Sequence, residues 1–177
     1  RGDCFDPPSL AAALHDVDAA FYLVHSMGEG AEFAQRDREA ADNFARACAA
    51  AGVKRIVYLG GLVPAGADSE HLLSRRDTGE RLRGHPVPVT EVRAGIIVGP
   101  GSAAFEVMRD LVLHLPVMVT PRWVRAVSTP IALDNLIHYL VEAPRAPEMA
   151  GGVYDAAGPD SLTYEAMMRG ICRILGH

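Results

Sequence analysis

The chain has 177 residues and a formal net charge of −5, from 17 basic and 22 acidic side chains. This acidic balance argues against a nucleic-acid-binding surface, and the length is typical of one domain with a sizeable core. The three cysteines form no Cys-x-x-Cys pair, and no apolar run approaches the ~20 residues of a membrane span. We therefore expect a cytoplasmic protein with reduced thiols and no membrane span.

Apolar runs alternate with helical patterns along the chain. The expected strands cover residues 19–24, 53–59, 89–93 and 153–155, with a further short strand at 117–120. The expected helices are a short one within residues 7–15, with Asp6 or Ser9 as its N-cap, and helices at 31–51, 70–82, 103–114 (capped by Ser102), 130–141 (entered through Asp134) and 161–175. Residues 121–124 are expected to form a surface loop. This alternation predicts an α/β fold with a parallel sheet covered by helices on both faces.

The clearest signal is a helix that runs into a strand at residues 49–61. Gly52 is expected to be the left-handed residue that ends the helix, and residues 56–59 form a β-branched and aromatic run typical of a buried strand. Gly60 and Gly61 then mark the carboxyl edge of the sheet, where ligands of such folds bind. Their missing side chains would let a ligand approach the backbone.

The long helix at 31–51 carries one carboxylate on its apolar stripe. The stripe consists of Phe33, Ala40, Phe44, Cys48 and Ala51, and Asp37 falls on it. Asp37 is either a functional carboxylate or a group hydrogen-bonded to the backbone of residues 28–30. Cys48 is expected to be inert core.

One further group of side chains suggests a binding role, with a simpler alternative. Arg122, Trp123 and Arg125 would suit an anionic or aromatic substrate, or they are solvated arginines beside a partly buried tryptophan. No histidine, cysteine or carboxylate cluster has metal-ligand spacing, so we predict no metal site. A glycine-rich dinucleotide loop and a Walker loop are both absent from the sequence.

Several stretches together carry a family resemblance. They are Gly2-Asp3-x-x-Asp6-Pro7-x-Ser9-Leu10 and residues 17–24, 51–58, 92–101 and 130–134. In these stretches the chain resembles the extended and atypical short-chain dehydrogenase/reductases, particularly the NmrA-like ones. The resemblance implies an NAD(P)-binding Rossmann-like domain, a doubly wound parallel sheet, whose first two strands and glycine loop would lie upstream of Arg1. The strand at 19–24 would then be an exposed apolar edge, available for pairing with another chain.

The resemblance also implies a site for NAD or NADP. Asp3 would lie near the adenine, and Val24, His25 and Ser26 would pass the ribose and phosphates. Gly60, Gly61, Arg93, Ala94, Gly95 and Ile96 would lie near the nicotinamide, and Arg76 would hold a ribose or phosphate.

The family's catalytic groups are not matched in this sequence. Its serine falls on Gly61 and its Tyr-x-x-x-Lys pair on Leu72 and Arg76, while its helix asparagine falls on Asp37. Because Leu72 cannot donate a proton, His71 and His25 are considered as substitute acids, and Asp37, His71 and Arg76 remain the catalytic candidates. Three functions stay open: a reductase of a small molecule, a non-catalytic NAD(P) sensor of NmrA type, and a structural subunit of an assembly.

Overall fold

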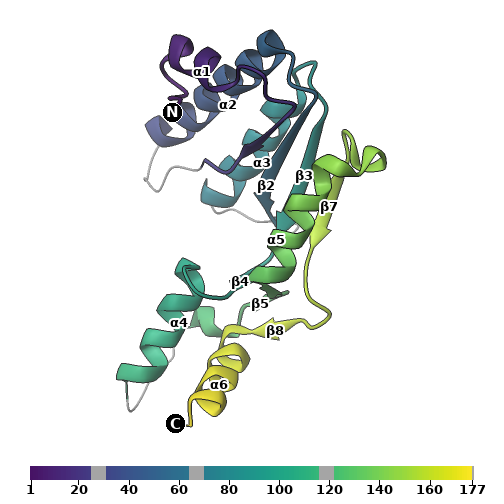
Figure 1. Ribbon diagram of the computed structural model, residues 1–177. Coiled ribbons are helices and arrows are strands. Elements are labelled where there is room, and N and C mark those ends of the chain that lie inside the picture. The colour runs from purple at the N-terminus through teal and green to yellow at the C-terminus, as the bar shows by residue number, and fades with distance from the viewer. Residues whose placement is uncertain (25–30, 64–69, 116–121, 177) are drawn as a thin grey trace. The chain divides into compact units, whose positions relative to one another are not determined.

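The computed structural model describes residues 1–24, 31–63, 70–115 and 122–176 (Figure 1). The chain divides into two compact units. The first contains residues Arg1–Arg93 and Tyr139–Asp155, and the second contains Ala94–His138 and the residues from Ala156 onward. That the whole chain acts as one incomplete cofactor-binding domain stays a prediction.

The first unit is built on a sheet of four strands in the order β1-β2-β3-β7. Their bounds are Ala19–Tyr22 for β1, Arg55–Gly61 for β2, Val89–Ala94 for β3 and Val153–Ala156 for β7. β1 runs parallel to β2, with Ala19 opposite Arg55 and Tyr22 opposite Tyr58. The predicted α/β class with a parallel sheet is confirmed.

The strand β1 lies at one edge of this described sheet. It ends at Tyr22, so Leu23 and Val24, which we expected in the strand, follow it as exposed residues. Phe21 is also exposed, because it points away from the face that carries the buried Tyr22. Pairing of this edge with another chain stays a prediction.

Three helices cover the sheet face that carries Tyr22: α1 (Pro7–Ala13), α2 (Ala31–Ala51) and α3 (Glu70–Arg83) (Figure 1). The ring of Tyr22 lies 5.0 Å from that of Phe44 on α2 and 6.0 Å from that of Tyr58 on β2. Cys48 is fully buried in this core, as predicted, and burial raises the pKa of its thiol to about 12. The predicted stripe is wrong at Ala51, which is exposed because it lines an open groove beside α1.

The turn from α2 into β2 follows the sequence closely. Gly52 has a φ of 75°, and the amide of Val53 donates to the carbonyl of Cys48 over 3.0 Å, so the helix ends as predicted. The strand, which we expected to end at residue 59, continues through Gly60 and Gly61. The Cβ that an alanine would add at Gly60 would lie 2.8 Å from Oε1 of Glu91, and at Gly61 it would lie 3.1 Å from Nε of Arg75. Side chains of the protein therefore occupy the space beside both glycines.

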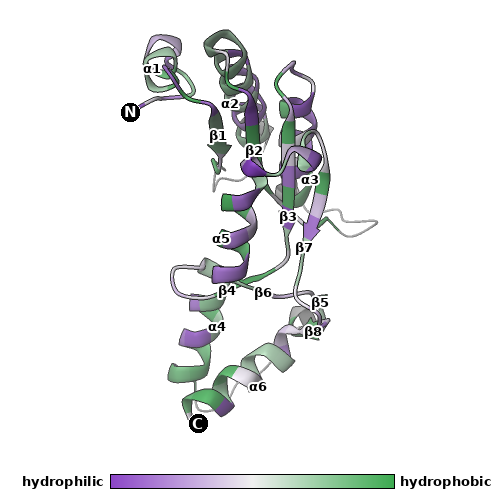
Figure 2. Ribbon diagram, turned by 45° about the vertical axis from the view of Figure 1, so that its right-hand side comes forward, coloured by the Kyte–Doolittle hydropathy of each residue, from purple (hydrophilic) through white to green (hydrophobic). Residues whose placement is uncertain are grey.

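The second unit contains two short sheets and a methionine-rich core. β4 (Ile97–Val98) pairs parallel with β6 (Ile131–Ala132), and β5 (Val127–Ser128) pairs antiparallel with β8 (Leu162–Thr163). The helices α4 (Ala103–His114) and α6 (Tyr164–Leu175) alternate polar and apolar residues (Figure 2). Their apolar sides meet in a core of Met108, Val124, Met167 and Met168.

Two helices begin later than the sequence predicted, because short strands precede them. The helix expected at 130–141 is α5 (Leu133–Glu142), since Ile131 donates its amide to the carbonyl of Ile96 over 2.8 Å as part of β6. The helix expected from residue 161 begins after β8 at Tyr164. There Thr163 caps α6 by accepting from the amide of Ala166 over 3.1 Å.

The other departures concern caps and loops. Asp6, one of the two expected N-cap residues, stands at the N-cap of α1, which begins at Pro7, and Ser9, the other, lies inside that helix. Ser102 stands at the N-cap of α4, but its hydroxyl donates to the carbonyl of Ile97 over 2.6 Å. Where we expected a loop at 121–124, residues Arg122–Arg125 form the 3-10 helix η1, in which Val124 is buried. The strand expected at 117–120 lies outside the described residues. Two further 3-10 helices are η2 (Ala143–Arg145) and η3 (Pro147–Met149).

Candidate functional site

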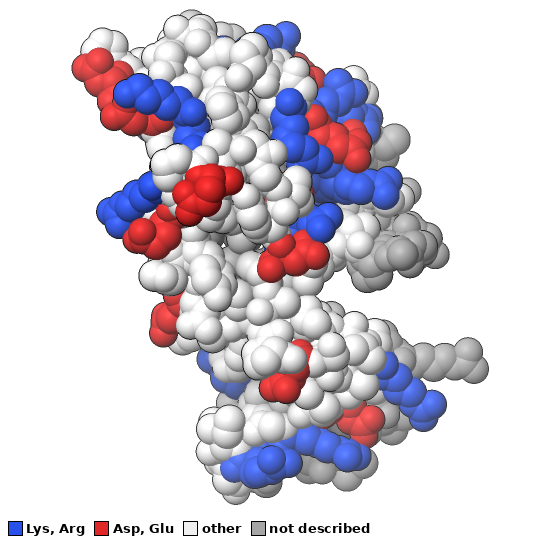
Figure 3. Space-filling model, turned by 90° about the vertical axis from the view of Figure 1, so that its right-hand side faces the viewer, with Lys and Arg blue, Asp and Glu red and all other residues white. Residues whose placement is uncertain are grey.

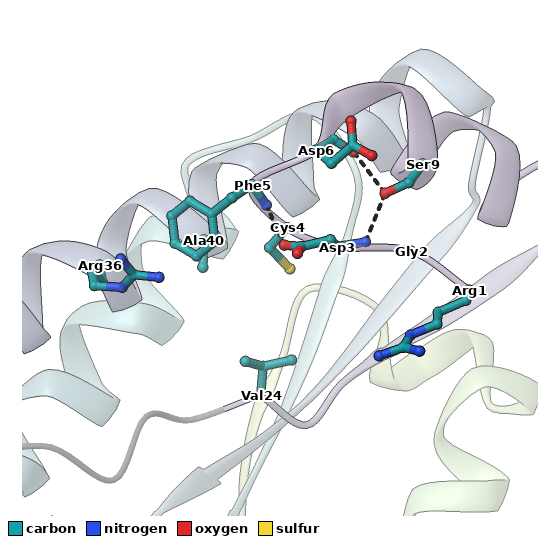
Figure 4. Close-up of a pocket in the computed structure, with 10 residues that line it drawn as sticks. All are labelled: Arg1, Gly2, Asp3, Cys4, Phe5, Asp6, Ser9, Val24, Arg36 and Ala40. Atoms are coloured by element: carbon teal, nitrogen blue, oxygen red, sulfur yellow. Dashed lines mark hydrogen bonds between the residues drawn. The ribbon is translucent and has the colours of Figure 1, made fainter.

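A cavity of about 550 Å³ lies in the first unit, between the N-terminal loop and α2 (Figure 4). Asp3 and Val24, which the family resemblance placed at the cofactor, line this cavity together. Val24 follows the carboxyl end of β1, the end of a parallel strand at which α/β folds bind ligands. The full lining consists of Arg1, Gly2, Asp3, Cys4, Phe5, Asp6, Ser9, Val24, Arg36 and Ala40.

The loop that forms one wall is fixed by hydrogen bonds to its own side chains. The amide of Asp3 donates to Oγ of Ser9 over 2.9 Å, and that hydroxyl donates to the carbonyl of Asp6 over 2.9 Å (Figure 4). The amide of Phe5 donates to Oδ1 of Asp3 over 2.8 Å. Asn43 of α2 then ties the loop to the helix by donating to the carbonyl of Cys4 over 2.9 Å. The loop is thus held in shape without a ligand.

The ring of Phe5, in this loop, packs against Arg36 of α2 (Figure 4), and no sequence signal pointed to either residue. The guanidinium carbon of Arg36 lies 4.7 Å from the centre of the Phe5 ring, within the range of a cation–π contact. Arg36 is exposed on α2, and Phe5 is 42% exposed. Phe5 and Arg36 lie far apart in the sequence, so no local spacing could have predicted their contact. The pKa of the neighbouring Cys4 is raised, first by burial and then by the charge of Asp3.

A second group of side chains surrounds the carboxyl end of β2. Arg75 of α3 donates from Nη2 to the carbonyl of Leu59 over 2.7 Å, and the hydroxyl of Tyr58 donates to the carbonyl of Arg75 over 2.8 Å. The Nε atom of Arg75 is buried and has no hydrogen-bond partner in the described part of the chain. Burial raises the pKa of Tyr58, and the Arg75 charge opposes that shift. Sequence reasoning passed over Arg75 because it assigned the family lysine to Arg76.

One strand further along, Glu91 of β3 is buried between two glycines. It forms an ion pair with Arg83, and its carboxylate fills the positions that a Cβ would take at Gly60 and Gly79. The glycine at 60 therefore makes room for a buried carboxylate. This arrangement could not be predicted without knowing the pairing of β2 with β3.

The remaining expected cofactor residues fall into separate groups. In the first unit, Arg93 at the end of β3 donates from Nε to Oδ1 of Asp155 over 2.7 Å. In the second unit, Ala94 is buried, the amide of Gly95 donates to the carbonyl of Ala156 over 3.3 Å, and the carbonyl of Ile96 accepts from Ile131. His25 and Ser26 lie outside the described residues.

Of the three catalytic candidates, neither Asp37 nor Arg76 lines the cavity. Asp37 is buried and accepts a hydrogen bond from Oγ of Ser74 over 3.1 Å, while residues 28–30, its other expected partner, lie outside the described residues. Arg76 is exposed on α3, with its Nε 3.9 Å from Oε1 of Glu80, and it does not line the cavity. The backbone of His71 belongs to α3, but its side chain lies outside the described part of the structure.

The proposed substrate-binding arginines and the metal and membrane expectations can be placed only in part. Arg125 is exposed, and the side chains of Arg122 and Trp123 are not described. Within the described ranges, no three histidine, cysteine or acidic side chains gather as metal ligands, and no helix is both long and apolar enough to cross a membrane. On the face shown in Figure 3, basic and acidic side chains are interspersed.

Comparison with known proteins identifies similar folds and one relative. No family model matches the chain. The chain is 29% identical to a (4-alkanoyl-5-oxo-2,5-dihydrofuran-3-yl)methyl phosphate reductase of Streptomyces griseus, over 99% of the chain and 58% of the reductase. The chain thus spans less than two thirds of this relative's length.

Two solved structures with similar folds contain NAD. A double mutant of DesIV, a dTDP-glucose 4,6-dehydratase from Streptomyces venezuelae with NAD bound, has a TM-score of 0.85 at 17% identity, covering 99% of this chain and 62% of that one. MoeE5 in complex with UDP-glucose and NAD has a TM-score of 0.84 at 16% identity, covering 99% of this chain and 68% of that one. The sheet, its helices and these likenesses together show that the chain has a Rossmann-like α/β fold.

Proposed function

We propose that the chain is the NAD(P)-binding part of a reductase of the short-chain dehydrogenase type that acts on a small molecule. The observation that carries the proposal is the cavity beyond the carboxyl end of β1, in which Asp3 and Val24 lie together. The similarity to a reductase and to NAD-containing structures supports it. NmrA-like character remains part of the proposal.

The cavity suits the adenosine end of a dinucleotide. Its volume of about 550 Å³ falls within the range of small-molecule sites. The Phe5 ring with Arg36 against it presents a flat surface on which a purine can pack. Oδ1 of Asp3 accepts from the amide of Phe5, and no described residue donates to its other carboxylate oxygen, which we propose accepts from a ribose hydroxyl or an adenine amine. Arg1 and Arg36 supply positive charge for the phosphates.

The substrate is proposed to carry a phosphate. The reductase relative is named for a methyl phosphate, and the structure of MoeE5 holds UDP-glucose, a nucleotide sugar with a diphosphate. When bound, NAD(P)H would supply the hydride. The chain's own residues would bind and orient the cofactor and the anionic substrate.

A second candidate is a non-catalytic NAD(P) sensor, and one observation favours it. Gly61 lies in β2, Leu72 is half-buried, and Arg76 is exposed and paired with Glu80, so these three positions offer no acid that can be placed on a carbonyl oxygen. Turnover of a carbonyl or enone by the NADPH-loaded protein separates the reductase from the sensor and from a structural subunit.

Calorimetric titration of NADPH and NADH into the wild type and two tryptophan variants tests the proposed cofactor site. Val24→Trp places a large ring at the cavity wall and should weaken cofactor binding by at least about tenfold, because it takes the volume that the adenosine needs. Ile174→Trp is the matched control, at a position that is 85% exposed in α6 of the second unit. Equal affinities in both variants, or no binding of either cofactor to the wild type, would contradict the proposal.

A further inference from the structure

Three of the four arginines of α3 form ion pairs with described carboxylates, and Arg75 does not. Arg76 pairs with Glu80 at 3.9 Å, Arg81 with Asp42 at 3.4 Å, and Arg83 with the buried Glu91. For Arg75, no carboxylate lies within ion-pair distance among the residues that the structure describes. Among the described residues, Arg75 is thus the arginine of α3 whose guanidinium has no carboxylate partner.

Arg75 is also held in place. Its Nη2 donates to the carbonyl of Leu59, its own carbonyl accepts from Tyr58, and its Nε packs beside Gly61, where an added Cβ would lie 3.1 Å away. A side chain fixed in this way loses little conformational freedom when it binds a ligand. A Cβ at position 61 would crowd the guanidinium in this position.

The position of Arg75 in the fold suggests a binding role for its charge. It lies beside Leu59 and Gly61 at the carboxyl end of β2, the end at which ligands of parallel α/β sheets bind. A half-buried cation without a counter-ion is unfavourable, and a bound anion relieves the cost. A guanidinium presents several donors to an anion, which suits the oxygens of a phosphate.

We propose that Arg75 is an anion-binding residue, which holds a phosphate group of the ligand at the carboxyl end of β2. The phosphate comes either from the dinucleotide or from the substrate, so the inference rests on the proposed function for the identity of the ligand. The role differs from that expected of Arg76, which is exposed and already paired.

The test measures the binding of methyl phosphate, NADPH and NADH to the wild type and to variants, by thermal shift and by calorimetry. Methyl phosphate should raise the Tm of the wild type, and Arg75→Gln should weaken its binding by at least about tenfold through loss of charge-assisted hydrogen bonds. Arg81→Gln removes the same charge from an exposed part of α3 and should bind as the wild type does. Gly61→Ala keeps the charge but displaces the guanidinium, so it should weaken binding even if Arg75→Gln fails to fold.

The NADPH and NADH titrations identify the source of the phosphate. If Arg75→Gln also weakens NADPH or NADH binding, the anion is a cofactor phosphate; if it weakens methyl phosphate binding alone, the anion belongs to the substrate. Methyl phosphate binding that is undetectable in the wild type, or equal in the wild type, Arg75→Gln and Gly61→Ala, would overturn the proposal. Failure of both cofactors to bind, with methyl phosphate binding still dependent on Arg75, would instead remove the proposed function and leave the anion site in place.

Discussion

Replacement of Gly79 by alanine should destabilise the protein, although the substitution lies inside a helix. Alanine in a helix interior is normally favoured over glycine by about 1 kcal/mol. In α3 the new Cβ would lie 2.6 Å from Oε2 of Glu91 and 3.0 Å from its Cδ, closer than van der Waals contact allows. Overpacking of this kind costs about 1–3 kcal/mol, so a net loss of up to about 2 kcal/mol is expected after the helix gain is subtracted.

Urea unfolding followed by circular dichroism measures this loss. Gly170→Ala provides the matched control, because Gly170 lies within α6 and an added Cβ there would meet nothing within 4 Å. That variant should gain about 1 kcal/mol. In a Glu91→Ala background the obstructing carboxylate is gone, so Gly79→Ala should become stabilising there. A Gly79→Ala protein that is as stabilised as Gly170→Ala would refute the placement of Glu91 against α3.

Two further predictions concern the sheet and the core. In the same urea assay, Arg55→Ala should lower the free energy of unfolding by about 2 kcal/mol, because Nη1 of Arg55 donates to Thr90 and to the carbonyls of Ala143 and Ala146. The control Lys54→Ala removes an exposed neighbouring cation and should leave the free energy of unfolding unchanged. Cys48 should resist Ellman's reagent at pH 8 until the protein unfolds, because only the thiolate reacts and burial raises the pKa of this thiol to about 12. Rapid labelling of Cys48 in the native state would contradict its burial.

The elements that the sequence predicted well are those with strong local signals. The helix at 31–51 and the turn at Gly52 were found as expected, since apolar periodicity and a left-handed glycine act within a few residues. The helix at 130–141 failed at its start because its first residues pair with β4, a contact that no local pattern reveals. Propensity alone does not show which partner a short segment will find.

In the candidate site too, residues that lie in a recognisable motif were predicted and residues that depend on distant contacts were not. Asp3 and Val24 were singled out by a resemblance in motif, and the fold brings them to one cavity. Phe5, Arg36 and Arg75 were missed, because their roles depend on contacts between elements that are distant in sequence. Gly60 was interpreted as space for a ligand, but a buried carboxylate from the neighbouring strand takes that space. Composition cannot distinguish these two reasons for a glycine.

Amide NMR spectra recorded during titration with NADPH and NADH test the central proposal most directly. If the cavity holds the adenosine end of a dinucleotide, the largest shifts should appear at Asp3, Phe5 and Arg36, which line it. Spectra that stay unchanged at saturating cofactor, or shifts confined to residues of the second unit, would contradict the assignment of this cavity as the cofactor site.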